Sequence, residues 1–371
     1  MRILIISGYK EWGGYTIALD GLCQLPGVEV WQYGRWKGDK FGSLTPDSML
    51  FTRHLNHQAI TSEETARQWL KQKKFDCIIA TTQARDVSLR NLHPVKVLAK
   101  LRFARKFGSP DSRERVTLGA NILPFWDDVI GATPVLGIDT FDDSLVHPPD
   151  MPLFLRSKLF FKSNLPYKYS ANFVEKDSHG GNTYLEESEK FRPFSLGISD
   201  DRYRELRAVR AATAGDYKYD VFASIYVRNT IRKHALAELL KLKETSKLKI
   251  LIPEGRIPAD EFYRLCAQSR VTLSPEGGGW DCARHYESIA CGSLPLMNRP
   301  HLHTRWERDL PEACVFENDF SDYARKLVAL VELSRQPDLL DKLTQIVETR
   351  FTRSELMRYV LAEAGFTLPK V

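Results

Sequence analysis

The residues of this chain that are best suited to chemistry lie between Leu273 and Pro300. Gly277, Gly278 and Gly279 follow one another there, so no Cβ atom keeps an anion away from the N–H groups of this loop. A helix is predicted to begin directly after the loop, and a helix amino terminus adds a positive partial charge. The sequence therefore predicts a loop that binds a phosphate group.

Two side chains of the predicted helix could hold the rest of a nucleoside diphosphate. Arg284 and Glu287 are three residues apart, which places them on one face of a helix. A guanidinium can bind phosphate oxygens through two N–H groups, and a carboxylate can accept hydrogen bonds from both hydroxyls of a ribose. Asp281 is predicted to cap the helix. The alternative is purely structural, with a cap, a solvent-exposed helical pair and a loop that has no ligand.

The elements around the loop are those of a nucleotide-binding unit. Val271–Leu273 is a short apolar run that stops at Ser274, and Leu294–Met297 is a second apolar run after the helix. The predicted order is strand, glycine loop, helix, strand. Because open α/β sheets bind ligands at the carboxyl ends of their strands, Ser274 and the glycines are expected to line a ligand site.

The segment SPEGGGWDCARHYESIACGSLPLM resembles the donor-site motif of GT-B glycosyltransferases, whose two Rossmann-like domains face each other. The resemblance is strongest to the exostosin-like and group 1-like branches. There a Ser-Pro-x-Gly loop precedes a helix with the pattern Arg-x-x-(Tyr/Phe)-Glu-(Ala/Ser)-x-Ala-x-Gly, and a strand with Pro-(Val/Leu) follows. The matching residues of this chain are Arg284, Tyr286, Glu287, Ser288, Ala290, Gly292, Pro295 and Leu296.

The resemblance implies a role for each of the main site residues. Glu287 would bind the ribose of a sugar nucleotide, and Arg284 and the glycine loop would bind its diphosphate. Arg228 and Arg232, at the junction of a predicted strand and helix, would bring further positive charge to the diphosphate. They could instead be surface charges on an early helical turn. The implied donor is a UDP- or GDP-sugar, which is a co-substrate, so no cofactor is expected.

One position departs from the pattern of many retaining members of these families. Those enzymes carry a second glutamate eight residues before the ribose-binding one, and Gly279 occupies that position here. The double-glutamate pattern is incomplete, which favours an inverting enzyme without establishing the stereochemistry. An inverting transferase needs a general base that takes the proton of the acceptor hydroxyl.

Asp139 is the first candidate for that base, and Asp142 is the second. Both follow a predicted strand at 133–137, in a segment crowded with acidic residues. The alternative interpretation is turn and cap chemistry ahead of two prolines. No metal site is predicted, because arginines could neutralise the leaving group, although the acidic turn leaves metal dependence open.

Composition and length indicate a two-domain soluble protein. The chain has 371 residues, of which 43% are apolar and 27% charged, with a net charge of +6. No window approaches the ~20 consecutive apolar residues of a membrane span, and the apolar run in MRILIISGYKEWGG is too short for a secretory signal. Six cysteines without metal-ligand spacing indicate reduced thiols. We expect a cytoplasmic protein, with peripheral attachment to the inner membrane surface as a further option.

The predicted fold class is α/β of the GT-B type, with two doubly wound Rossmann-like domains facing a cleft. Residues 1–195 are expected to form the acceptor domain and 196–350 the donor domain. Residues 351–371 are expected to form a helix that braces both. The first domain begins with a strand, a loop containing Gly13 and Gly14, and a helix. In GT-B folds the equivalent loop faces the cleft.

The sequence thus predicts a metal-independent glycosyltransferase that moves a sugar to a hydroxyl of a glycan, a lipid-linked acceptor or a modified nucleic-acid base. Residues 85–115 carry nine Lys or Arg against three Asp or Glu. This basic segment could be a solvated helix face, or it could bind an acidic acceptor, a membrane surface or nucleic acid. Two alternative functions follow, a nucleic-acid-binding protein and a protein that binds a sugar nucleotide without catalysis.

Overall fold

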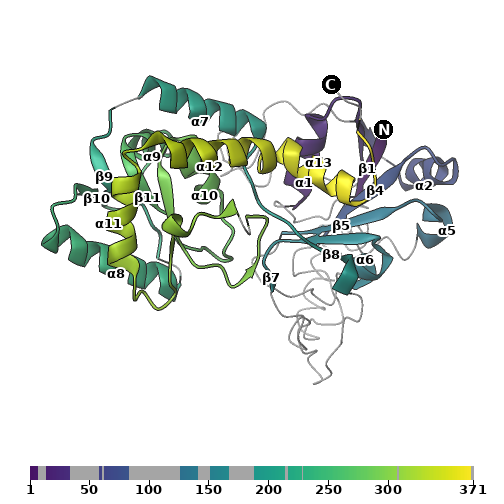
Figure 1. Cartoon of the computed structure of the whole chain (residues 1–371). Coiled ribbons are helices and arrows are strands. Elements are labelled where there is room, and N and C mark those ends of the chain that lie inside the picture. Colours follow the sequence, from purple (N-terminus) through teal and green to yellow (C-terminus); the bar gives the residue numbers. More distant parts are fainter. Residues whose placement is uncertain are drawn as a thin grey trace, which may run out of the picture.

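A computed structural model describes residues 1–6, 14–33, 58–60, 62–82, 126–140, 151–166, 188–213, 216–227, 229–306 and 309–368. Gly13, Asp142, Arg228 and the basic segment 85–115 lie outside these residues, so the predictions that concern them stay predictions. The described chain forms two parallel sheets with helices packed around them (Figure 1). The prediction of two Rossmann-like α/β domains is confirmed.

The first domain is built on a seven-stranded parallel sheet in the order β3-β2-β1-β4-β5-β6-β8. Strands β4 and β5 are buried along their whole length, as expected of parallel strands that are covered on both faces. The strands are β1 Arg2–Ile6, β2 Glu29–Tyr33, β3 Gln58–Ile60, β4 Cys77–Thr81, β5 Val135–Asp139, β6 Leu159–Lys162 and β8 Phe191–Pro193. The helical segments are α1 Gly14–Cys23, α2 Glu63–Lys71, α5 Asp127–Ile130, α6 Met151–Arg156 and η5 Ser188–Lys190.

The second domain is built on a five-stranded parallel sheet in the order β10-β9-β11-β12-β14. Its strands are β9 Tyr219–Phe222, β10 Ile250–Leu251, β11 Ser269–Leu273, β12 Leu294–Asn298 and β14 Val315–Phe316. Its helical segments are α7 Asp200–Ala212, α8 Thr230–Thr245, α9 Ala259–Ala267, α10 Ala283–Ala290, η7 Glu312–Cys314, α11 Tyr323–Leu333 and α12 Pro337–Arg350. The predicted strand, glycine loop, helix and strand are confirmed as β11, α10 and β12, with β11 and β12 adjacent in the sheet.

One prediction within this unit is wrong, because Asp281 does not cap α10. The N-cap residue is Cys282. The Asp281 carboxylate instead accepts the backbone N–H of Leu196 at 2.8 Å and the hydroxyl of Tyr286 at 2.5 Å. Leu196 lies in the segment between the two sheets, so the carboxylate joins the start of α10 to the domain junction.

The chain passes between the domains twice, and the two passages run side by side. The N–H of Ile198 donates to the carbonyl of Phe351 at 3.0 Å, and the N–H of Arg353 donates to the carbonyl of Ile198 at 3.0 Å. Gly197 has a φ of +58°, and a Cβ there would lie 2.3 Å from the carbonyl oxygen of Phe351. Glycine is therefore required where the passages approach each other.

Helix α13, Arg353–Glu363, returns to the first domain and packs against α1 (Figure 1). Arg353 Nη1 lies 2.8 Å from Asp20 Oδ2 in an ion pair whose side chains are 3% and 0% exposed. A Cβ at Gly21 would lie 2.1 Å from the Arg353 carbonyl oxygen, so only glycine allows the two helices to cross this closely. The helix ties the end of the second domain to the first.

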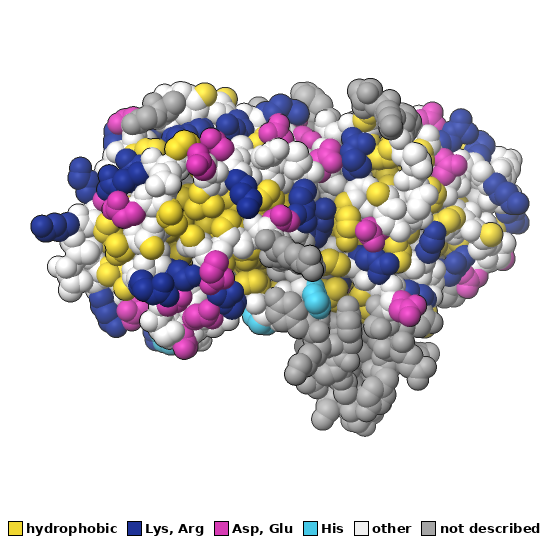
Figure 2. Space-filling view, in the orientation of Figure 1, with side chains coloured by type: hydrophobic (Ala, Val, Ile, Leu, Met, Phe, Trp, Pro, Cys, Tyr) yellow, Lys and Arg dark blue, Asp and Glu magenta, His cyan; other side chains and the backbone are white. Residues whose placement is uncertain are grey.

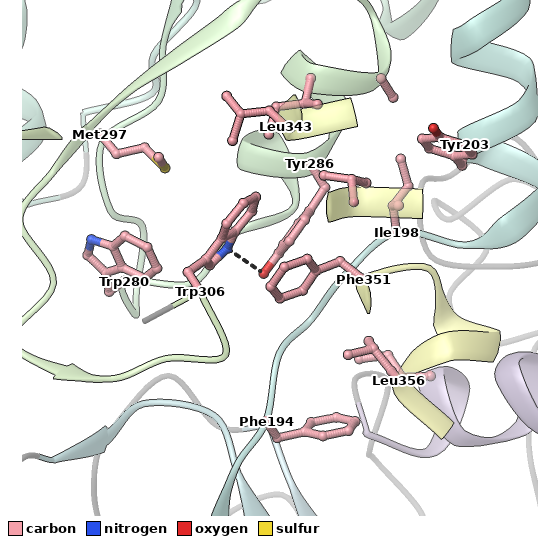
Figure 3. Packing of buried hydrophobic residues seen from close by; sticks show 14 of the residues in the cluster. Phe194, Ile198, Tyr203, Trp280, Tyr286, Met297, Trp306, Leu343, Phe351 and Leu356 are labelled. Carbon is pink, nitrogen blue, oxygen red and sulfur yellow. Dashed lines mark hydrogen bonds between the residues drawn. The ribbon is translucent and has the colours of Figure 1, made fainter. Parts of the chain in front are cut away.

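Aromatic rings fill the junction between the domains (Figure 3). The ring centroids of Trp306 and Phe351 are 4.4 Å apart, and those of Trp306 and Tyr286 are 5.7 Å apart, both in stacked arrangements. Trp306 Nε1 also donates to the Tyr286 hydroxyl at 3.3 Å. These rings belong to a buried apolar cluster that extends into both domains, so core packing holds the domains together.

The surface shows charge of both signs. On the face in Figure 2, Lys and Arg side chains are interspersed with Asp and Glu over both domains, and hydrophobic side chains gather over the second domain. Within the described ranges, none of the helices has the length and apolar character to span a membrane.

Candidate functional site

The carboxyl edges of the two sheets meet at the glycine loop. Asn164 follows β6 of the first domain, and its Oδ1 accepts the backbone N–H of Trp280, just after the loop, at 3.1 Å. The short strand β7, Leu165–Pro166, pairs antiparallel with β13, Leu302–His303, of the second domain. The predicted phosphate loop therefore lies where ligands bind in open α/β sheets, opposite the other domain.

Two asparagines hold the glycine loop in shape. Asn229, the N-cap of α8, donates from Nδ2 to the carbonyl of Gly277 at 2.6 Å. Asn298, the last residue of β12, accepts the N–H of Glu276 at 2.8 Å and donates to its carboxylate at 2.8 Å. The Gly277 N–H donates to the carbonyl of Gly279 at 2.8 Å, so it closes the loop rather than pointing to a ligand.

The structure brings Arg232 to the glycine loop. Arg232 lies in the first turn of α8, and its Nε donates to the carbonyl of Glu276 at 2.7 Å. A Cβ at Gly277 would lie 3.0 Å from Arg232 Nη2, so the guanidinium lies directly against the loop. Arg232 and the glycines thus share one location, and donor binding by them stays a prediction.

Arg284 and Glu287 lie on one face of α10, beside α9. Glu287 is 3% exposed, and its Oε1 accepts the hydroxyl of Tyr263 at 2.9 Å. The Arg284 guanidinium lies over the Phe262 ring, 5.4 Å from its centroid. Arg284 Nη1 is buried and has no hydrogen-bond partner within the described part of the chain. A buried donor of this kind is costly unless a ligand accepts from it.

The carboxylate of Glu287 is in an environment that opposes its charge. Burial raises the pKa of Glu287, and the hydrogen bond from Tyr263 and the charges of Arg284 and Arg202 lower it only in part. Donors from a ligand would stabilise the ionised form. The site therefore has a buried acceptor, Glu287, beside a buried donor, Arg284.

Ser274 lies behind the loop. It is fully buried, and its Oγ lies 2.8 Å from Nδ1 of His285 on α10. His285 Nε2 lies 2.8 Å from the carbonyl oxygen of Trp280. Ser274 thus supports His285, and its contact with a donor stays a prediction.

Cys282 is part of the site in a way that its sequence context does not indicate. This partly buried thiol is the N-cap of α10, with Sγ 3.6 Å from Nε2 of His285. Burial alone would raise its pKa, but His285, Arg284 and Arg232 together lower the pKa of Cys282 below its ordinary value. The nearby thiol conversely helps to raise the pKa of His285 against the effect of burial.

On the first domain, Asp139 lies in a buried cluster at the strand ends. Its Oδ2 is 2.8 Å from Nζ of Lys162 at the end of β6, and both side chains are fully buried. Its Oδ1 accepts the hydroxyl of Thr82 at 3.3 Å. The cluster joins the ends of β4, β5 and β6. The role of Asp139 as a general base stays a prediction, and the structure adds Lys162 as its ionic partner.

Gly14 is the first residue of α1 and is buried, so it belongs to the helix rather than to the loop in which the sequence analysis placed it. Residues 7–13 lie outside the described part of the chain, so the predicted role of this loop stays a prediction. Across the parts of the chain that the structure describes, no group of three or more His, Cys, Asp or Glu side chains could hold a metal ion.

Sequence reasoning did not identify Asn164, Asn229 or Asn298 as site residues. Asn229 could have been found, because asparagine ahead of a helical pattern is a typical cap. Asn298 directly follows a predicted strand, which is a weaker signal. Asn164 carries no local signal, since its partner lies 116 residues away in the chain.

The sequence matches no family model and no curated protein. Several solved structures are similar over nearly the whole chain. HepE of Anabaena in complex with UDP has 13% identity, covers 98% of this chain and 100% of its own, and has a TM-score of 0.48. Trehalose-6-phosphate from E. coli bound with UDP-2-fluoro glucose has 8% identity, 100% coverage of both chains and a TM-score of 0.48. The catalytic domain of starch synthase IV from Arabidopsis thaliana, bound to ADP and acarbose, has 11% identity, covers 97% of this chain and 99% of its own, and has a TM-score of 0.46. At these sequence identities and TM-scores, the similarity concerns only the overall fold.

Proposed function

We propose that this protein is a glycosyltransferase that binds a nucleotide-activated sugar on its second domain and transfers the sugar to an acceptor hydroxyl. The observation that carries the proposal is the composition of the α10 site. A glycine loop, two arginines and a buried carboxylate surround the amino terminus of one helix, and Arg284 has a buried N–H without a partner among the described residues. The family motif that the same residues match supports the assignment.

The diphosphate is proposed to bind at the glycine loop, between Arg232 and Arg284. Arg232 lies against Gly277, and Arg284 lies in the first turn of α10. The amino terminus of α10 adds its positive partial charge to these two cations. When the bond between sugar and diphosphate breaks, the same groups would stabilise the charge that develops on the leaving group.

The ribose is proposed to bind at Glu287. The hydroxyl of Tyr263 donates to Oε1 and so fixes the rotamer of the carboxylate. A vicinal diol would then donate to the carboxylate and offset the cost of its burial. A UDP- or GDP-sugar is the proposed co-substrate, and the proposal includes neither a cofactor nor a metal ion.

The acceptor is proposed to bind on the first domain, with Asp139 or Asp142 as the base that removes its proton. The basic segment 85–115 is the proposed contact for an anionic acceptor or surface. We also propose a cytoplasmic location, which the scattered spacing of the six cysteines in the sequence supports.

The test of the donor site is a thermal-shift screen with UDP-, GDP-, ADP-, CMP- and TDP-sugars on the wild type and on Glu287→Gln. At least one sugar nucleotide is expected to raise the wild-type Tm by several degrees, because a ligand that binds only the folded state stabilises it. Glu287→Gln keeps an acceptor for Tyr263 and removes a buried charge, so its own Tm is expected to be equal or higher. Its nucleotide-induced shift is expected to be mostly lost.

Lys218→Gln is the matched control for the screen, since it removes one charge from an exposed position of the same domain and should respond as the wild type does. If no sugar nucleotide shifts the wild type, or if Glu287→Gln responds as strongly as the wild type, the donor site is wrongly assigned. Slow hydrolysis of the bound donor without acceptor would separate an enzyme from a non-catalytic binding protein.

A further inference from the structure

A residue of the first domain lies inside the glycine loop of the second. Asn164 follows β6, is 4% exposed and has a φ of +55°. This left-handed conformation is rare for residues other than glycine, and asparagine tolerates it better than most. The conformation is therefore maintained by what surrounds the residue.

The side chain of Asn164 occupies the space where residue 279 would carry a side chain. A Cβ built on Gly279 would lie 2.4 Å from Asn164 Nδ2 and 2.6 Å from its Oδ1. Both contacts are far shorter than any that real Cβ atoms make. The amide of Asn164 thus gives a structural reason for glycine at the position where the sequence lacks a glutamate.

The backbone on either side of Asn164 is anchored in the first domain and at the junction. Before it, the N–H of Ser163 donates to the carbonyl of Asp139 at 2.9 Å, and Lys162 is held in the buried ion pair. After it, Leu165 pairs with His303 across the two domains. Asn164 therefore presents its amide from a fixed frame.

The contact partner of Asn164 is Trp280, the residue that directly follows the glycine loop. Trp280 stands between the three glycines and α10, and its N–H donates to Asn164 Oδ1 at 3.1 Å. Its indole Nε1 donates to the carbonyl of Asn298 at 2.7 Å. A loop of glycines has many accessible conformations, so the bonds at its end determine which one is populated.

We propose that Asn164 is a positioning residue for the nucleoside diphosphate: from the first domain it holds the glycine loop of the second domain in the shape that binds this ligand. The inference rests on the proposed function. Its consequence is that the donor site is complete only when the two domains are docked as they are here. Donor affinity is then coupled to the arrangement of the acceptor domain.

The test compares two substitutions of Asn164 that both tolerate its left-handed backbone with one control substitution elsewhere at the junction. Asn164→Gly keeps the left-handed backbone and removes the amide. Asn164→Asp keeps an acceptor for the Trp280 N–H and a residue type that tolerates this backbone. Arg192→Gln is the control for a change at the domain junction that does not touch the loop. Arg192 Nε forms a partly exposed ion pair with Glu363, the last residue of α13, at 2.7 Å.

Binding of UDP and of GDP to each variant is measured by calorimetry, and folding is checked by the Tm of each variant. Loss of one hydrogen bond that orders the loop corresponds to about a tenfold weaker Kd, so Asn164→Gly is expected to weaken binding about tenfold. Asn164→Asp keeps the acceptor but adds a negative charge beside an anionic ligand, so its affinity is expected to be lower than that of the wild type, whereas Arg192→Gln is expected to match the wild type. Equal affinity of Asn164→Gly and the wild type would overturn the proposal, as would a loss in Arg192→Gln equal to that in Asn164→Gly.

A second pair of variants separates positioning from general destabilisation. Gly279→Ala places a Cβ against the amide of Asn164, so it is expected to lower nucleotide affinity. In the Asn164→Gly background the clash is gone, and adding Gly279→Ala is expected to cost little more. An equal additional loss in both backgrounds would show that the two positions are independent and would contradict the proposal. If the wild type binds neither nucleotide, it is the proposed function that fails, which is a different outcome from equal binding by wild type and variant.

Discussion

At the scale of single residues, the site around α10 contains ionisable groups whose surroundings shift their pKa away from its ordinary value. Burial raises the pKa of Glu287, so its protonated form stabilises the fold. That contribution is complete below the ordinary pKa of glutamate and is lost as the pH rises through the raised pKa. At neutral pH the ionised carboxylate therefore costs stability, which is the pattern expected of a side chain retained for binding.

Cys282 gives a residue-scale prediction on reactivity. His285, Arg284 and Arg232 lower the pKa of Cys282 against the effect of burial, whereas burial and Asp20 raise the pKa of Cys23, another partly exposed cysteine, to about 12. Because the thiolate displaces iodide from iodoacetamide, Cys282 is expected to be alkylated at least about tenfold faster than Cys23 at neutral pH. Peptide mass spectrometry over a time course measures both rates.

A sugar nucleotide that binds the loop would cover Cys282 and is expected to slow its alkylation several-fold, while the rate at Cys23 stays unchanged. Faster labelling at Cys23 than at Cys282 would show that the thiol at α10 is not activated by its neighbours.

At the scale of elements, the architecture depends on two close approaches that only glycine permits. Gly197 allows the two passages between the domains to pair, and Gly21 allows α1 and α13 to cross. Neither residue belongs to the nucleotide motif. Gly197 and Gly21 instead determine how the two domains are arranged, and this arrangement places Asn164 against the glycine loop.

Gly21→Ala tests the crossing of α1 and α13. Helix propensity alone predicts that alanine stabilises α1 by about 1 kcal/mol. The new Cβ would lie 2.1 Å from the Arg353 carbonyl oxygen, so we expect instead a loss of about 1–3 kcal/mol in the free energy of unfolding. Urea denaturation measures the change, and its sign decides between the two effects. A stabilised variant would mean that the helices do not cross at this residue.

At the scale of the whole molecule, the two domains form one unit through a continuous apolar cluster and a buried ion pair. The cluster contains Trp306 and Phe351 at the junction together with residues of both sheets (Figure 3). The ion pair between Asp20 and Arg353 links the first helix of the chain to the last. An interface this apolar resists separation, so we expect the domains to unfold together.

Arg353→Met tests the ion pair. It leaves the Asp20 carboxylate buried without its cation, and we expect a loss of about 3–5 kcal/mol in the free energy of unfolding. The double variant Asp20→Asn with Arg353→Met removes both charges and is expected to lose clearly less than the single variant. Urea denaturation of Arg353→Met, Asp20→Asn, the double variant and the wild type closes the cycle, and a double variant that loses as much as the sum of the two single changes would show that the charges do not interact.

Much of the second domain could be predicted because its signals are local. The apolar run before Ser274, the three glycines, the helical spacing of Arg284 and Glu287 and the next apolar run all lie within about thirty residues. They predicted β11, the loop, α10 and β12 correctly. A strand–loop–helix unit can be predicted from a short segment because each element determines its own spacing of apolar residues and the position of its glycines.

The sequence by itself therefore determined the α/β class and the strand, glycine loop, helix and strand of the second domain, and it supplied the candidates for binding a diphosphate and a ribose. Only the tertiary structure decided how those residues are held. Asp281 joins the domain junction rather than capping its helix, Ser274 supports His285, and Asn164 enters the loop from the other domain. Hydrogen bonds between residues 85 and 116 positions apart leave no trace in local spacing, because they depend on how two separately formed domains pack.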